Sequence, residues 1–401
     1  MNTRMSKAPR ASSKSKAMTV LSRVTHTAAI IAFTWLLASC ATAPLPRAPA
    51  PSPPVADTPR ADGAISLPPA RTQGKSRWVP VPWTDLPGFE SDALFEAWNA
   101  WLKSCERPGP AFAPLCGEVR RLSIASADEQ RAWMMNRLQP YRVESPQGQA
   151  EGLLTSYYEP VLRASRQSAS GYTVPIYQPP AGLASRKPWF TRQEIDTLPE
   201  AQAALRGREI AWVADPIDAM SLHIQGSGRL SIIEPNGAQR TVRVAFAGSN
   251  DQPFRSIVQW LAEQGQGRMV APWTESTKAW AAQNPQRLPQ LLWSNPRYIF
   301  FREEALSEQD ASYGPRGAQG VALTPGRSIA VDRESIPYGT PVWLASRGAA
   351  VDLQKLVIAQ DTGSAIVGAV RADYFAGTGL EAGLLASRVN QPLRLWALWP
   401  K

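Results

Sequence analysis

The chain has 401 residues, of which 43 are Lys or Arg, 33 are Asp or Glu, 3 are Cys and 2 are His, and its formal net charge is +10. Six of the basic residues and His26 precede residue 28, so the remainder carries 37 basic against 33 acidic residues and one histidine, His223. The lack of a Lys/Arg block argues against a nucleic-acid partner. A single histidine argues against a Ser-His-Asp triad and against a His-rich zinc site.

The N-terminus predicts export. Residues 28–37 form an apolar run after a basic segment, and a run of about ten residues is too short to span a bilayer but is typical of a signal peptide. Leu37–Cys40 (L-A-S-C) resembles a bacterial lipobox, which implies that Cys40 becomes the lipidated first residue. Because Ala41 rather than Asp follows, we expect a lipid anchor on the periplasmic side of the outer membrane. An ordinary signal peptide with an incidental cysteine is the alternative, and Met18 is a second candidate start.

A proline-rich segment follows the cysteine. Nine prolines lie between Ala41 and Ala70, with Ala, Ser and Thr among them. This composition predicts a disordered tether over residues 40–75 that would reach on the order of 100 Å if extended. Such a tether would let an anchored domain reach the cell wall, and a passive spacer explains the same composition.

Cys105 and Cys116 flank the segment E-R-P-G-P-A-F-A-P-L. Outside the cytoplasm, an even pair of cysteines around a short loop predicts a disulfide. Closing this loop would stabilise the fold by roughly 3 kcal/mol in the chain-entropy model. Two free structural thiols are the alternative.

The first predicted elements of the globular part are helical. Asp92–Lys103 has apolar residues at helical spacing, which predicts one buried face. The residues of that face are Leu94, Phe95, Trp98, Trp101 and Leu102. A capping box at Ser126–Glu129 predicts a second helix that Pro140 ends.

Beyond residue 150 the pattern predicts mainly short strands. We expect strands around Tyr157 and Val174, and His223 reads as an ordinary strand residue in M-S-L-H-I-Q-G-S-G. Pro253–Gln264 predicts a helix with Pro in its first turn. From Asn295 the chain returns to β-structure, so we expect a β-rich middle domain between an N-terminal helical piece and a C-terminal β-barrel.

Three aspartates in the last hundred residues stand next to turns or strand ends. They are Asp332 in S-I-A-V-D-R-E-S-I-P-Y-G-T, Asp361 in V-I-A-Q-D-T-G-S-A-I-V-G and Asp373 in A-V-R-A-D-Y-F-A-G-T-G. Carboxylates are rarely buried unless they are paired or functional. Their placement on strands of core composition predicts an acid/base site, and aspartates that only cap turns are the alternative.

Five separated motifs together resemble the membrane-bound lytic murein transglycosylase A family. The last third of the chain, with its aspartates in order, is similar to the 3D domain named for them. The motifs are G-L-L-T-S-Y-Y-E-P (Gly152–Pro160), the run Asp215–Leu230 with I-Q-G-S-G-R-L, F-A-G-S-N-D-Q-P-F-R-S-I (Phe246–Ile257), N-P-R-Y-I-F-F (Asn295–Phe301), and the three aspartate segments.

The resemblance implies a mainly β fold: a double-psi β-barrel with a second β-domain inserted and a deep groove between them. Together with the N-terminal signals, the resemblance implies four parts of the chain. A signal peptide covers 1–39 and the tether 40–75; the barrel, with its N-terminal helices, takes 76–158 and 295–401, and the inserted domain takes 159–294.

The resemblance also implies cleavage of the β-1,4 bond between N-acetylmuramic acid and N-acetylglucosamine in peptidoglycan, in cell-wall turnover. Enzymes of this kind form a 1,6-anhydromuramoyl product without water or a cofactor. If the muramic acid's own C6 hydroxyl attacks C1, one carboxyl group is enough, because it first donates and then accepts a proton. The expected partners are glycan strands, the outer membrane and other cell-wall enzymes.

The family's catalytic aspartate maps onto Asp373. We expect its pKa to be raised so that it starts protonated. Asp361 is the expected second carboxylate, which would raise the pKa of Asp373 by repulsion or hold it by hydrogen bonds, whereas Asp332 reads as structural. Plausible substrate contacts in the matched motifs are Tyr157, Gln225, Ser227 and Asn250.

Three other functions remain open at this level. An expansin-like wall-binding lipoprotein would share the barrel but cleave no bond. A hydrolase would need two carboxylates at a separation that admits water. A purely structural lipoprotein would use Asp373 for no chemistry.

Overall fold

The computed structural model describes residues 67–267 and 272–401. These described residues belong to one compact unit. The predicted signal peptide, Cys40 and the predicted tether up to residue 66 lie outside the described residues. Within the described ranges no helix combines the length and apolarity needed to cross a bilayer.

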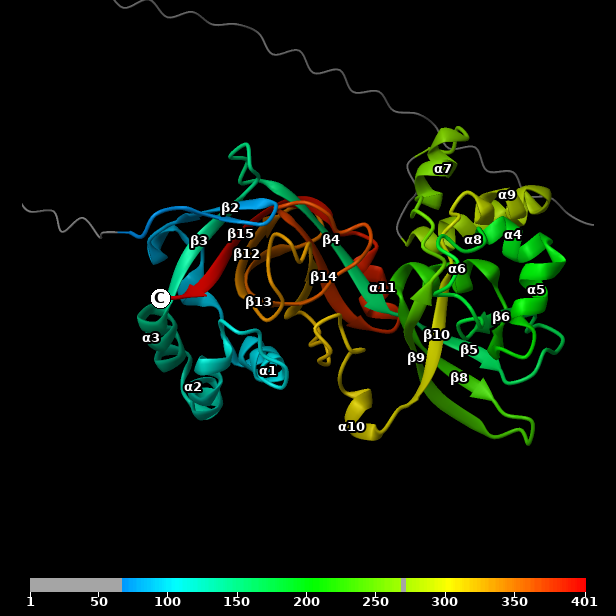
Figure 1. The fold of residues 1–401 in the computed structure, drawn as a ribbon, viewed down its shortest axis with the longest axis horizontal. Helices are drawn as coiled ribbons and strands as arrows, with labels where there is room; N and C mark the ends of the chain where they lie inside the picture. The colour runs from blue at the N-terminus through cyan, green and yellow to red at the C-terminus, as the bar shows by residue number, and fades with distance from the viewer. Residues whose placement is uncertain (1–66, 268–271) are drawn as a thin grey trace, which may run out of the picture. The chain divides into compact units, whose positions relative to one another are not determined.

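Strands from both ends of the described chain form one mixed sheet. It contains β1 (Arg71–Gln73), β2 (Ser76–Pro80), β3 (Leu138–Glu144), β4 (Gly152–Glu159), β11 (Ser328–Val331), β12 (Pro341–Arg347), β13 (Asp352–Asp361), β14 (Arg371–Thr378) and β15 (Asn390–Pro400). The order is β1-β2-β3-β15-β12-β13-β11-β14-β4, and β4 also pairs with β15. The strands from β15 to β4 therefore close into a barrel (Figure 1).

Strand β12, in the middle of the barrel sheet, is buried on both faces. In β12, Val342 and Leu344 pack in one hydrophobic cluster with Leu154, while Trp343 and Ala345 pack in a second cluster with the N-terminal helices. Successive side chains of a strand point to opposite faces, so an unbroken apolar run is what a strand covered on both sides requires.

The N-terminal helices supply the outer cover. They are α1 (Phe95–Ser104), α2 (Cys116–Arg121) and α3 (Ala127–Arg137). The capping box at Ser126 is confirmed. Phe95 does not belong to the buried face, since it starts α1 and is 65% exposed. The predicted end of the tether at residue 75 is also wrong, because Arg71–Gln73 pairs with β2 as an edge strand.

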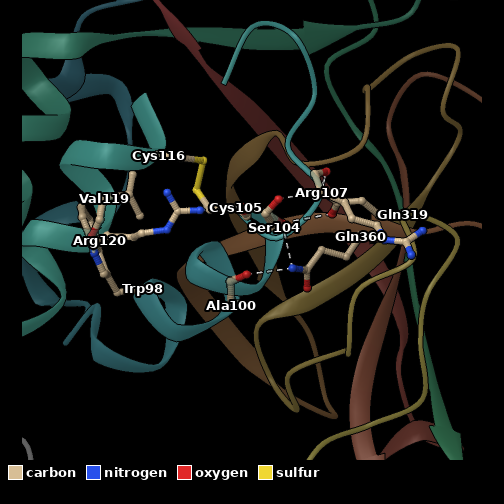
Figure 2. Close-up of a disulfide and its surroundings, with 10 residues drawn as sticks. All are labelled: Trp98, Ala100, Ser104, Cys105, Arg107, Cys116, Val119, Arg120, Gln319 and Gln360. Atoms are coloured by element: carbon tan, nitrogen blue, oxygen red, sulfur yellow. Dashed lines mark hydrogen bonds between the residues drawn. A yellow bond between two sulfur atoms is a disulfide. The ribbon is translucent and has the colours of Figure 1, made fainter. Parts of the chain in front are cut away.

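A disulfide and a buried amide tie α1 into the barrel. Cys105, directly after α1, is bonded to Cys116 at the start of α2, with their Cα atoms 5.6 Å apart. Figure 2 shows Gln360 of β13 reaching α1, where its Nε2 donates to the Ala100 carbonyl oxygen and to Ser104 Oγ, both at 2.8 Å. These contacts hold the strand that ends in Asp361 against a covalently braced helix.

The second sheet is the inserted domain. It contains β5 (Val161–Ser165), β6 (Val174–Tyr177), β7 (Glu209–Val213), β8 (Ser227–Ile233), β9 (Gln239–Ser249) and β10 (Ile299–Ala305), in the order β10-β9-β8-β5-β7-β6. The boundary expected between residues 294 and 295 is wrong, because β10 pairs with β9. The sequence N-P-R-Y-I-F-F does return to β-structure, but the apolar face of β10 completes the insert's core.

Helices pack on this second sheet and on one another. They are α4 (Arg192–Thr197), α5 (Pro199–Leu205), α6 (Pro216–Gln225), α7 (Ile257–Glu263), α8 (Trp273–Gln283) and α9 (Leu288–Trp293); α10 (Glu308–Ala311) and α11 (Leu380–Ala386) lie in the chain beyond it. Helices α4, α5 and α6 pack on the second sheet, and α7, α8 and α9 pack on α6. His223 is therefore a helical residue, because Asp215 caps a helix that Gly226 ends with positive φ. The helix expected from Pro253 begins later, where Ser256 accepts from the Gln259 N–H.

One buried carboxylate joins the two sheets. Glu159, at the end of β4, is fully buried, and its Oε1 and Oε2 accept from Arg243 Nε at 2.7 Å and Arg229 Nε at 2.8 Å. Thr378 of the barrel donates to the same carboxylate, and both arginines donate to the Tyr313 carbonyl oxygen. Both chain crossings between the sheets are thus held at one point, which fixes the walls of the space between them.

Candidate active site

The two C-terminal aspartates of interest lie on strands that flank β11. Asp373 on β14 and Asp361 on β13 are both in register with Ala330. Because two strand spacings separate them, their Cα atoms lie about 10 Å apart. Asp332 stands just beyond the end of β11. The strand order therefore brings Asp361 and Asp373 to the same level of the barrel.

Asp373 is held by two polar side chains. Thr155 Oγ1, opposite it on β4, donates a short hydrogen bond to Asp373 Oδ1, and Arg371 Nη2 donates to the same Thr155 Oγ1 at 2.8 Å. Burial raises the pKa of the Asp373 carboxyl to about 6, against the opposing effects of the Thr155 hydrogen bond and the Arg371 charge. The carboxyl group is therefore much more easily protonated than an ordinary aspartate.

This chain of hydrogen bonds also indicates which oxygen carries the proton. Thr155 Oγ1 accepts from Arg371 and donates its own hydrogen to Asp373 Oδ1. Oδ1 is thereby occupied as an acceptor, which leaves Oδ2 to bear the proton of the neutral acid. The arrangement orients an acid rather than merely burying one.

A cleft of about 320 Å³ lies at this carboxyl group and has walls from both sheets. The barrel contributes Thr155, Tyr157, Asp373 and Asn390, among others. The insert contributes Ile224 and Gln225 from α6 and Trp273 and Glu275 from α8. A groove between the two β-domains is thus present, and its walls are mixed in polarity.

Of the two predicted effects of Asp361 on Asp373, repulsion is present and a hydrogen bond is not. Its carboxylate accepts from Tyr157 Oη at 2.8 Å and from the backbone N–H groups of Ala318 and Thr362, both at 2.9 Å. No hydrogen bond links it to Asp373 within the described residues, and its repulsion is a smaller cause of the raised pKa of Asp373 than burial. Asp361 instead fixes Tyr157 and the loop at Ala318.

The four predicted substrate contacts fare differently. Tyr157 and Gln225 line the cleft, and Gln225 Oε1 also accepts from the Tyr158 N–H at 3.0 Å. Ser227 lies in β8 opposite Ala245 and outside the cleft lining. Asn250 is wrong as a groove residue: it is 0% exposed and bonds the backbone at Phe190, Pro296 and Tyr298. The sequence suggests a functional role for this polar side chain, but in the structure it holds loops of the insert together by hydrogen bonds.

Asp332 organises a turn. It is 7% exposed, and its carboxylate accepts from the backbone N–H groups of Glu334 and Gly368 at 3.1 and 3.0 Å. Lys75 Nζ lies 3.6 Å away. The structural reading of this aspartate agrees with these contacts.

Sequence reasoning missed Thr155, Arg371 and Glu275. A period-of-two rule could have found the first two, because Thr155 lies two residues before Tyr157 and Arg371 two residues before Asp373, so each shares a face with a selected residue. Glu275, on α8, carries no such signal.

Comparisons with known proteins agree with this architecture. Residues 153–302 match the model of the MltA specific insert domain, and residues 327–399 match that of the 3D domain. A membrane-bound lytic murein transglycosylase A of Vibrio cholerae is 30% identical over 72% of this chain and 76% of its own length. The insert match begins within β4 of the barrel and ends within β10 of the second sheet.

Solved structures show the same fold. The lytic transglycosylase LtgG of Burkholderia pseudomallei is 38% identical, with a TM-score of 0.57 over 84% of this chain and 98% of its own. The structure of Escherichia coli MltA with bound chitohexaose has a TM-score of 0.64 at 21% identity, over 83% of this chain and 96% of its own. The predicted fold, a double-psi β-barrel with an inserted β-domain, is confirmed.

Proposed function

This chain belongs to the membrane-bound lytic murein transglycosylase A family and is a peptidoglycan lytic transglycosylase, and we propose that Asp373 is its single acid/base. The observation that carries the proposal is the environment of Asp373. Its carboxyl group lines the cleft between the two sheets, and burial raises its pKa to about 6. A group with such a pKa donates and recovers a proton near neutral pH.

The reaction needs no second carboxylate. Asp373 Oδ2 donates its proton to the glycosidic oxygen, O4 of N-acetylglucosamine, as the bond from that oxygen to C1 of N-acetylmuramic acid breaks. The C6 hydroxyl of the same muramic acid attacks C1 and gives its proton to the Asp373 carboxylate. The products are a free O4 hydroxyl and a 1,6-anhydro ring, and the acid is regenerated without water.

Neighbouring residues prepare this step. Thr155 and Arg371 orient the carboxyl group and favour its ionised form, so they assist the stage after the first proton has left. Tyr157, held by Asp361, forms a rigid wall of the cleft and packs on Phe375 with ring centroids 5.3 Å apart. The expected ligand is a glycan strand, which the binding of chitohexaose to the Escherichia coli relative supports.

The lipidated Cys40 and an anchor on the periplasmic side of the outer membrane remain part of the proposal. The relatives are named membrane-bound, and the sequence around Cys40 supplies a means of attachment. In that setting the enzyme would act in cell-wall turnover.

The test is mass spectrometry of muropeptides released from purified sacculi by the protein lacking residues 1–40. We expect anhydromuramoyl products from the unchanged protein and none from Asp373→Asn, which keeps the size of the side chain. Products heavier by one water, with a reducing end, would show a hydrolase instead.

Glu275→Gln is the matched control, because Glu275 lines the same cleft from the insert side. Retained anhydro products in this variant would agree with a single acid. Loss of all release in both variants would point to two essential carboxylates, and the absence of release by the unchanged protein would favour a wall-binding module.

A further inference from the structure

A second polar pocket lies in the inserted domain and takes no part in the proposed reaction. It encloses about 470 Å³ and is lined by residues of β6, α4, α5 and α6. Its deepest lining residues are Arg192, His223 and Tyr298, which are only 6%, 5% and 5% exposed. A polar floor of this kind is unusual, because buried polar groups are normally paired.

The buried guanidinium of Arg192 has no acidic partner. It donates to the carbonyl oxygens of Asn295 and Arg297 and to His223 Nδ1 at 2.9 Å. Among the ion pairs within residues 67–267 and 272–401 none includes Arg192. Burial lowers the pKa of Arg192 in spite of the nearby charge of Asp196. Because a buried charge that is only partly compensated is costly, an anion at this pocket would stabilise the guanidinium further.

His223 adds a fixed donor beside that charge. Because arginine only donates, His223 Nδ1 must accept, which places the ring hydrogen on Nε2. This Nε2 is buried and finds no hydrogen-bond partner among the described residues. The ring is packed against Tyr298 and Phe301, with centroids 4.3 and 5.5 Å away. Guanidinium and N–H together suit a carboxylate.

The rim of the pocket carries both signs of charge. Arg206, Asp196 and Glu209 all belong to its lining. A ligand that presents only carboxylates would meet these two acids, whereas an end group with one carboxylate and one ammonium would match both the floor and the rim. The mixed rim therefore favours an amino-acid-like end group.

Helix α6 connects this pocket to the catalytic cleft. Its last residues, Ile224 and Gln225, line the cleft, while Ala219 and His223 line the second pocket. The helix has 10 residues, which corresponds to about 15 Å. The lining residues Ala219 and Gln225 are separated by only about 9 Å of helical rise. An extended peptide of four residues spans about 13 Å, so a peptide attached to a sugar in the cleft is long enough to cover that separation.

We propose that this pocket is a subsite for the peptide stem of peptidoglycan, with a stem carboxylate at Arg192 and His223 and a stem amine toward Asp196 and Glu209. The inference rests on the proposed function. It makes the enzyme selective for strands that carry peptides, and the selectivity resides in the insert rather than in the barrel.

The test compares kcat/KM of the full-length, detergent-solubilised chain on stem-bearing strands and on strands stripped of peptides by an amidase. We expect a preference of about tenfold for stem-bearing strands, the contribution of one or two charged hydrogen bonds. His223→Phe keeps a ring in the core but removes the donor, and should bring the ratio close to one. Arg206→Ala, an exposed rim change, should lower the ratio less.

Controls separate a subsite from a structural role. Gln225→Ala, on the cleft side of α6, should lower kcat/KM on both substrates alike. A loss on both substrates in His223→Phe, with the ratio unchanged, would overturn the subsite, as would equal use of the two strands by the unchanged chain. Cleavage of neither strand by the unchanged chain would instead contradict the proposed function.

A direct measurement completes the test. Calorimetric titration of the Asp373→Asn chain with amidase-released stem tripeptide should show binding that His223→Phe weakens by about tenfold. Absence of binding to the parent variant at millimolar peptide would overturn the proposal.

Discussion

Two carboxylates line the cleft, one from each domain, and their surroundings differ. Asp373 lies in a closed barrel, where burial raises its pKa to about 6 and Thr155 fixes its orientation. Glu275 lies on a helix of the insert, with its side chain 68% exposed and 3.8 Å from Lys278. The barrel thus removes water from one acid, and the insert leaves the other in solvent. Only the first environment prepares a carboxyl group for proton donation.

Substitution of each carboxylate in turn should show the largest difference between the two domains. Asp373→Asn should lower kcat about a thousandfold, because a general acid contributes that order of rate. Glu275→Gln should change kcat less than tenfold. Rates of anhydromuramoyl product formation measure both, and similar losses in the two variants would contradict a single acid.

The disulfide between Cys105 and Cys116 should contribute to the stability of the fold but not to the rate of catalysis. Replacing Cys105 and Cys116 together by serine should lower the free energy of unfolding by about 3 kcal/mol, since the loop between them is no longer closed in the unfolded chain. Denaturant unfolding measures this, and kcat at a temperature where the variant is folded should stay within about twofold. A collapse of kcat would mean that α1 positions Asp361 and the site directly.

Burial of Asp373 should have a cost in stability that depends on pH. Its folded pKa of about 6 lies above the ordinary aspartate value of 3.8, so its protonated form favours the fold below pH 4 and this contribution is lost as pH rises through 6. Asp373→Asn should therefore be more stable than the parent above pH 6, by at most about 3 kcal/mol for a shift of about two pKa units. Thermal unfolding of both at pH 4 and pH 8 tests this, and a pH-independent difference would contradict the raised pKa.

The pH dependence of activity also tests the raised pKa of Asp373. The acid must start protonated, so kcat/KM should fall about tenfold per pH unit above pH 6. Arg371 lowers the pKa of Asp373, so Arg371→Gln should move this limb to higher pH, and Arg371→Lys, which keeps the charge, should move it less. An unmoved limb in Arg371→Gln would mean that another group sets the profile.

Substitutions on the insert side of the cleft should have the smallest effect on the kinetic constants. Gln225→Ala should raise KM about fivefold and leave kcat nearly unchanged, as expected for one lost hydrogen bond to substrate. Ser227→Ala, close in sequence but outside the cleft lining, should leave both constants unchanged. A larger effect at Ser227 would require a different path for the glycan strand.

Much of the fold was predictable from local pattern. The capping box at Ser126 predicts the start of α3 correctly, and the apolar runs around Tyr157 and Val174 are strands. One failure depends on a distant partner, since the sequence-based boundary assigns β10 to the barrel although it pairs with β9. Another failure is local. His223 stands between a capping Asp215 and a left-handed Gly226, a helical pattern that its apolar neighbours obscure.

The sequence by itself determined which residues are available: strands of core composition, an aspartate at position 373, and a cysteine pair around a short loop. The tertiary structure decided what Asp373 does, because β14 pairs in parallel with β4 and brings Thr155 against it across 218 residues. It likewise gave Asn250 a structural role by burying it. Burial, and with it the pKa of a carboxyl group, depends on atoms that are remote along the chain, so no local pattern specifies it.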